Sequence, residues 1–156
     1  MILTTHILSG ALIGAEIKNP FYVAVISIIV HFFLDLFPHG DYLNKKSRLR
    51  DFWKVGVDLL FGFLLIFFVI HFKKISDPLI LRNIYIAIFF SLLPDATTFS
   101  YLWLKMKFLK PIYDFHQKLH HIHYPDFAPE REFRLKNNLW DIIISLISLI
   151  LFVFRF

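Results

Sequence analysis

Three side chains that bind metals recur at four-residue intervals near the end of an apolar segment, residues 21–37. They are His31, Asp35 and His39, and the segment breaks just before the last of them, at Pro38. An α-helix places side chains four residues apart on one stripe. Because ionisable groups inside an apolar membrane segment are costly, they usually serve a function. The spacing favours a metal site, with a buried polar network between helices as the plainer alternative.

Further imidazoles and carboxylates occur where other apolar segments begin or end. His6 and Asp58 lie near the starts of the first and third segments, and Asp95 follows Pro94 at the expected end of the fourth. A carboxylate at a helix C-terminus is unfavourable unless a cation compensates it. We expect all three as metal ligands, although such residues are also common at membrane interfaces and in turns.

A histidine-rich stretch supplies the last ligand candidates. His116 and His120 are four residues apart and would form one face of a helix, with His121 and His123 close behind. We expect His116 and His120 to bind metal. The alternative is a solvated loop at the membrane interface.

Two residues beyond the first stripe are candidates for roles beside the metal. Asp41 is expected to orient a ligand or to act as general base, and Lys45 to attract a phosphate group. The chain contains no Gly-x-Ser-x-Gly elbow, no phosphate-binding glycine loop and no dinucleotide fingerprint. Any catalysis would therefore be centred on a metal.

The composition is that of an integral membrane protein. Of 156 residues, 57% are hydrophobic, twenty are Phe and only 19% are charged. Cysteine is absent, so the metal ligands must be imidazoles and carboxylates. The net charge of +5 suits anionic lipid head groups, and no nucleic-acid-binding motif accompanies it.

The apolar segments predict an all-α, polytopic bundle of about five membrane helices in one domain, residues 1–156. The five segments are residues 3–15, 21–37, 55–72, 79–94 and 139–154. They divide the chain into a hairpin (1–37), a second hairpin (55–94), an interfacial histidine-rich loop (95–138) and a last helix (139–156). The first segment is the shortest, and we expect it to lie partly in the interface.

In an up-and-down bundle the candidate ligands would meet at one end. The loops on that side carry twelve of the Lys and Arg residues, against five on the other side. Because positive loops stay in the cytoplasm, we expect the metal site at the cytoplasmic face of the inner membrane of a bacterium or archaeon.

Short motifs give the chain a resemblance to a known family. They are Thr5-His6-Ile7-Leu8-Ser9-Gly10, His31-x-x-x-Asp35, Leu36-Phe37-Pro38-His39-Gly40-Asp41, Leu93-Pro94-Asp95 and His116-x-x-x-His120. On these motifs the chain resembles the bacterial inner-membrane metal-dependent hydrolase family, which is distantly akin to zinc-dependent phospholipase C and the zinc single-strand nucleases. The family's Pro-Asp-Ile-Asp-His run is here Pro38-His39-Gly40-Asp41 and Pro94-Asp95-Ala96-Thr97.

The resemblance implies seven metal ligands: His6, His31, Asp35, His39, Asp58, Asp95 and His116. We expect one or two divalent ions, zinc first among them, and a metal-activated water that attacks a phosphoester. The apolar surroundings predict membrane lipids as partners and an anionic lipid as substrate. The rival hypotheses are a metal-ion transporter and a metal-binding membrane protein without hydrolase activity. Transport would require ligands across the bilayer, and only His31 lies deep.

Overall fold

The computed structural model describes residues 1–42, 47–120, 122 and 132–156, and all regular structure within them is helical. The α-helices are α1 (Leu3–Glu16), α2 (Pro20–Leu34), α3 (Trp53–Phe72), α4 (Pro78–Leu102), α5 (Lys110–His120) and α6 (Leu139–Arg155). Short 3-10 turns, η1 (Leu49–Phe52) and η2 (Lys107–Leu109), precede α3 and α5. The all-α prediction is confirmed for these residues.

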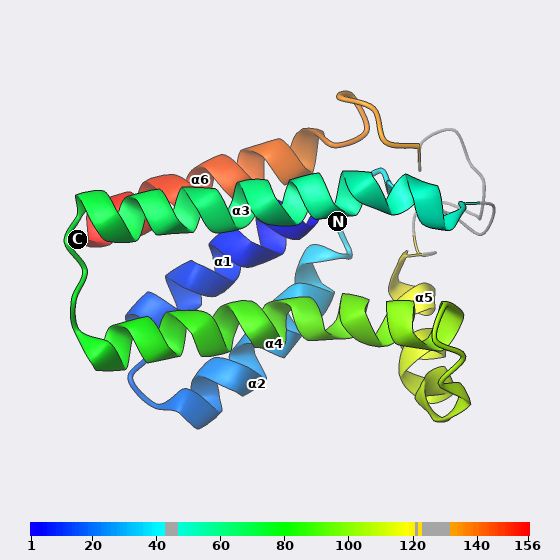
Figure 1. Cartoon of the computed structure of the whole chain (residues 1–156), viewed down its shortest axis with the longest axis horizontal. Coiled ribbons are helices and arrows are strands. Elements are labelled where there is room, and N and C mark those ends of the chain that lie inside the picture. Colours follow the sequence, from blue (N-terminus) through cyan, green and yellow to red (C-terminus); the bar gives the residue numbers. More distant parts are fainter. Residues whose placement is uncertain (43–46, 121, 123–131) are drawn as a thin grey trace.

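Helix α1 is the centre of the bundle and packs against α2, α3, α4 and α6. The long helices α3 and α4 run antiparallel, and their connection lies at the same end of the molecule as the C-terminus (Figure 1). Helix α5 lies against the other end of α4. The starts of α1 and α3 and the ends of α2 and α4 therefore meet near α5.

Local sequence explains where two of the helices begin. The Asn19 side chain accepts a hydrogen bond from the backbone N–H of Phe21, and Pro20 occupies the first position of α2. Asp77 accepts from the N–H of Leu79 in the same way, directly before Pro78 in α4. A polar cap followed by proline is a common helix start.

Glycine allows α1 to approach α4 closely. A Cβ atom at Gly14 would lie 2.4 Å from the carbonyl oxygen of Asn83, and one at Gly10 would lie 2.7 Å from Ser91 Oγ. The two glycines are four residues apart, as in the small-residue interfaces of membrane helices. This close contact sets the distance between His6 on α1 and the polar end of α4.

The fourth helix does not end at Pro94, contrary to the sequence-based expectation. Pro94 lies inside α4, which continues to Leu102. Proline removes one backbone hydrogen bond, and the last turns of α4 are retained because they pack against η2 and α5. Asp95 consequently projects from a continuous helix and not from a turn.

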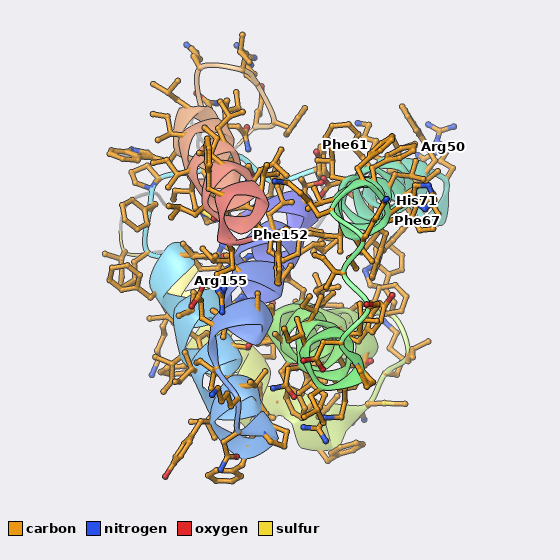
Figure 2. The ribbon with its side chains drawn as sticks, turned by 90° about the vertical axis from the view of Figure 1, so that its left-hand side faces the viewer. Arg50, Phe61, Phe67, His71, Phe152 and Arg155 are labelled. Carbon is orange, nitrogen blue, oxygen red and sulfur yellow. The ribbon has the colours of Figure 1, made fainter. Side chains whose placement is uncertain are left out.

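The expectation of about five membrane helices is also corrected. Within the described residues only 50–72 and 78–102 are long and apolar enough to cross a membrane, and α2 is a shorter apolar helix. At about 1.5 Å per residue a 15-residue helix rises about 22 Å, less than a hydrocarbon core of about 30 Å. Figure 2 shows Phe67 on the outer side of α3 and Phe152 of α6 in the interior.

Candidate metal centre

Six of the predicted ligands come together where α1, α2, α4 and α5 meet. They are His6, His31, Asp35, His39, His116 and His120, and Asp95 lies at the edge of the same cluster. His6, His31, Asp35, His39 and His116 are buried. The cluster contains three groups whose ligand atoms lie within 4.8 Å of one another: His6, His31 and Asp95; His31, Asp35 and His116; Asp35, His39 and His120.

The Asp35 carboxylate joins these groups. Its Oδ2 atom lies 2.7 Å from His116 Nε2, 3.0 Å from His31 Nε2 and 3.4 Å from His120 Nε2. Its Oδ1 atom faces the other way, 3.3 Å from His6 Nε2 and 3.1 Å from the amino group of Met1. Asp35 is therefore the residue that links the imidazoles of α1, α2 and α5.

Backbone and hydroxyl groups orient the imidazole rings. Nδ1 of His31 lies 2.6 Å from the carbonyl oxygen of Ser91, and Nδ1 of His39 lies 2.7 Å from that of Phe37. A carbonyl oxygen only accepts, so each Nδ1 donates its hydrogen and each neutral ring keeps its lone pair on Nε2. Histidines that bind metals are held by such contacts on the other ring nitrogen.

His116 is oriented by a side chain instead. Its Nδ1 atom lies 2.8 Å from Thr98 Oγ1, one turn beyond Asp95 on α4. This contact turns Nε2 of His116 toward Asp35. The extension of α4 past Pro94 is what brings the Thr98 hydroxyl into position.

The nitrogen atoms of four rings approach one another to hydrogen-bond distance. Nε2 of His116 lies 3.3 Å from Nε2 of His31 and 3.0 Å from Nε2 of His120. Nδ1 of His120 lies 3.0 Å from Nε2 of His39. Each such pair of nitrogen atoms can share either a proton or a metal ion. Around a tetrahedral zinc ion with bonds of about 2.0 Å, ligand atoms are about 3.3 Å apart. The donor set fits a metal ion.

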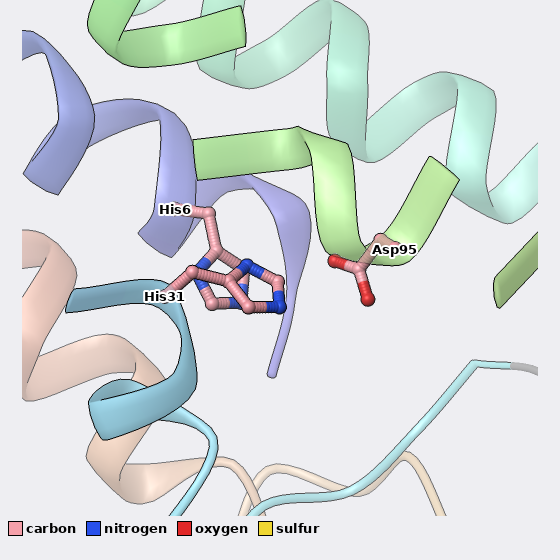
Figure 3. Close-up of side chains that lie close together, drawn as sticks. All are labelled: His6, His31 and Asp95. Atoms are coloured by element: carbon pink, nitrogen blue, oxygen red, sulfur yellow. The ribbon is translucent and has the colours of Figure 1, made fainter. Parts of the chain in front are cut away.

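The group on the α1 side contains buried polar atoms that lack hydrogen bonds. Within the described part of the chain, neither His6 Nδ1 nor Asp95 Oδ2 has a hydrogen-bond partner, and His6 Nε2 has only its 3.3 Å contact with Asp35, which lacks hydrogen-bond geometry. The rings of His6 and His31 stack with centroids 4.1 Å apart, and Asp95 points toward them from α4 (Figure 3). Buried polar groups normally have partners, so these atoms are suited to a cation.

The ionisation states of Asp35 and His120 are those that metal binding requires. Burial alone would raise the pKa of Asp35, but the Met1 ammonium and the His120 and His31 rings hold it well below its usual range. Burial lowers the pKa of His120, which favours the neutral ring that a metal requires. The centre thus offers an anionic carboxylate together with an imidazole that favours its neutral form.

Three sequence-based candidates have other positions. Asp58 lies outside the cluster: it accepts hydrogen bonds from the Leu3 N–H at 2.6 Å and from the Thr4 hydroxyl at 2.6 Å, and so caps α1. Asp41 lies at the rim, its Oδ1 atom 3.4 Å from His39 Nε2. Lys45 lies outside the described residues.

Two residues that shape the site, Asp141 and Thr98, were not predicted from the sequence. Asp141 accepts from the Ile2 N–H at 2.8 Å and from the Thr5 hydroxyl, so it holds the start of α1 together with Asp58. In the sequence it looks like an ordinary acidic residue in the first turn of the last helix. Thr98 looks like a helix-capping residue until the path of α4 is known.

A cavity of about 1660 Å³ opens beside the centre. Asp41, Asp95, His116 and His120 line its polar end, and mostly apolar side chains of α1, α3, α4 and α6 line the rest. The metal centre is thus accessible from a large, mostly apolar space.

Comparison with protein-family models, with curated proteins and with solved structures gives no match to this chain.

Proposed function

We propose that this chain is a membrane-embedded, metal-dependent hydrolase that cleaves a phosphoester of a lipid-borne substrate. The observation that carries the proposal is the buried cluster around Asp35. Imidazoles of His31, His116 and His120 lie 2.7 to 3.4 Å from one of its carboxylate oxygens, and His6 lies 3.3 Å from the other. Imidazole and carboxylate ligands without thiolate suit zinc, in one or two ions. The motif resemblance to the inner-membrane metal-dependent hydrolases supports the same assignment.

The chemistry proposed is hydrolysis: water adds to phosphorus, the ester P–O bond breaks and the leaving oxygen takes a proton. When bound, the metal supplies a water of lowered pKa and positive charge near the phosphoryl oxygens. Asp41 at the rim orients His39 or accepts a proton. Burial opposes its ionisation, but the neighbouring imidazoles, His39 first, hold the pKa of Asp41 well below its usual range.

The surface of the bundle supports a location in the membrane. Large apolar side chains are exposed along several helices: Phe21, Ile29 and Phe33 on α2, Phe67 and Phe68 on α3, Phe89 on α4, and Ile147 and Leu151 on α6. Exposed apolar surface on this scale is a liability in water and normal against lipid. We propose the inner membrane, with the metal centre toward the cytoplasm.

Elemental analysis of the purified protein tests the metal centre. Wild type should retain a tightly bound transition metal, whereas Asp35→Asn and His116→Ala should lose it. Asp77→Asn is the control, because the Asp77 carboxylate caps the start of α4, at the end of the bundle away from the cluster. Equal metal content in Asp35→Asn and Asp77→Asn would refute the site.

Release of phosphate from phosphatidic acid in mixed lipid bilayers then tests hydrolysis, with bis(4-nitrophenyl) phosphate as a soluble substrate that needs no lipid tail. Turnover should require the metal and should be lost in Asp35→Asn. Metal flux into liposomes without turnover would instead identify a transporter. A metal-loaded protein with neither activity would be a metal-binding membrane protein and no hydrolase.

A further inference from the structure

The large cavity has a polar end and an apolar end. Asp95, His116 and His120 lie at the polar end, together with Lys54 at the start of α3. Away from the metal centre most of the lining is apolar, for example Leu65 of α3 and Leu149 of α6, and Asp58 and Ser145 are among its few polar members. A ligand that fills this space must be amphiphilic, with an anionic head beside Lys54 and the metal centre.

The cavity extends along the bundle. Its lining on α3 runs from Trp53 to Leu65, thirteen residues that rise about 18 Å along the helix. Its volume of about 1660 Å³ is larger than the range of about 300–1,000 Å³ that is typical of small-molecule sites. The space is therefore long enough for a hydrocarbon chain in addition to a head group.

The packing of α3 explains why this space exists. Among the described elements α3 packs chiefly against α1, and it makes only minor contacts with α4 and α6. Seen along the bundle, α3 and α6 lie on different sides of α1 (Figure 2). Protein interiors are close-packed, so a groove of this size between membrane helices will be filled by an apolar group.

We infer that the groove between α1, α3 and α6 binds one acyl chain of a phosphate-bearing lipid and seats its head group at the metal centre. This inference rests on the proposed function and adds that the tail is held inside the bundle. Leu65, Leu146 and Leu149 are then residues that determine which tails are accepted.

Photo-crosslinking tests the position of the tail. The probe is phosphatidic acid with a diazirine near the end of one acyl chain, in phosphatidylcholine nanodiscs that contain the metal-loaded protein. Adducts should form on residues that line the groove. They should be lost in Leu65→Trp and in Leu149→Trp, because the indole occupies the space of the tail. The metal content of both variants shows whether the bundle has kept its fold.

Each blocking variant has a neighbour as control. Leu64→Trp and Leu151→Trp add the same bulk on exposed faces of α3 and α6, outside the groove. They should keep both the adducts and the hydrolysis of bis(4-nitrophenyl) phosphate. Adducts confined to outward residues such as Phe67, or equal labelling in all four variants, would overturn the inference. Crosslinks to a second copy of the chain in place of lipid adducts would also overturn it.

The two proposals fail in different ways. Tail adducts in the groove without any hydrolysis would support the lipid-binding groove and refute the hydrolase activity. Metal-dependent hydrolysis of the soluble ester, with no adducts in the groove, would support the hydrolase activity and refute the lipid-binding groove.

Discussion

Asp35 is the residue on which the metal centre depends. Its two oxygen atoms face different imidazoles, His6 on one side and His31, His116 and His120 on the other. Either oxygen of a carboxylate in this position could ligate a metal ion. His31 belongs to two of the three groups of candidate ligands, so these two groups could not bind metal independently.

The Thr98 hydroxyl offers a test of orientation at the residue scale. Thr98→Val keeps the shape of the side chain but removes the 2.8 Å contact to His116 Nδ1. Loss of such a contact typically weakens metal binding by about 10–100-fold. Competition with a fluorescent chelator measures the affinity, and Thr98→Ser should restore it. Weak binding in the serine variant as well would mean that Thr98 acts through packing alone.

The spacing of residues in the sequence identified most of the residues that gather in the cluster, but it predicted the local structure that positions them only in part. His31 and Asp35 are four residues apart and do meet, at 3.0 Å. Helix α2 ends at Leu34, however, so His39 reaches the centre through a turn and not along the helical stripe. Asp58 looked equivalent to the other carboxylates, because a sequence does not show that a neighbouring helix starts beside it.

At the scale of elements, α1 is the helix that all others share. Most of its residues are buried, and its two carboxylate caps, Asp58 and Asp141, come from α3 and α6. The start of α1 is thereby fixed to two helices that scarcely touch each other. His6, one turn into α1, takes its position from these contacts.

The close contact between α1 and α4 predicts a clear difference between two glycine substitutions. Gly14→Ala would place a Cβ atom 2.4 Å from the backbone of α4. Overpacking of this kind costs about 1–3 kcal/mol and would push His6 away from Asp95. Gly56→Ala in α3 meets nothing within 4 Å and should be neutral or stabilising by up to about 1 kcal/mol.

Thermal unfolding in detergent, followed by tryptophan fluorescence, compares the two variants directly. Metal content measured on the same samples reports whether the loss of stability reaches the centre. If Gly14→Ala unfolded at the temperature of wild type, the contact between α1 and α4 would be looser than described.

Pro94 shows the limit of sequence reasoning at the scale of elements. Proline usually marks the end of a helix, and residues 95–110 were expected to form an interfacial loop. Contacts with η2 and α5, which no local pattern reveals, retain the last turns of α4. The well-capped segments were easier to predict, so α2 and α4 begin within one residue of their expected starts.

For the whole molecule, the hydropathy pattern predicted the all-α class correctly, but it overestimated the number of helices that are long enough to cross a membrane. Apolar composition alone indicates five segments, but α1 is covered by its neighbours and α2 and α6 are short. Hydropathy does not distinguish a helix that is buried by neighbouring helices from a lipid-exposed helix of equal hydrophobicity. The meeting of distant ligands at one end, in contrast, followed from the up-and-down order of the segments.

The two long helices allow a test of the membrane topology. The chain contains no cysteine, so each single-cysteine variant carries one thiol for labelling. Ser76→Cys lies in the connection between α3 and α4, and Lys107→Cys lies in η2 at the opposite end. In intact cells, a maleimide that cannot cross the membrane should label Ser76→Cys at once, and should label Lys107→Cys only after permeabilisation.

Phe67→Cys provides the control within the hydrocarbon region. Its side chain is exposed on the outer face of α3, so lipid would shield the thiol from a charged reagent on both sides and detergent unfolding would release it. Because the excess of Lys and Arg lies on the side of the metal centre, labelling in the reverse order would contradict the positive-inside assignment. Ready labelling of all three thiols in intact membranes would show that α3 does not cross the membrane. There would then be no reason to expect a lipid tail in the groove.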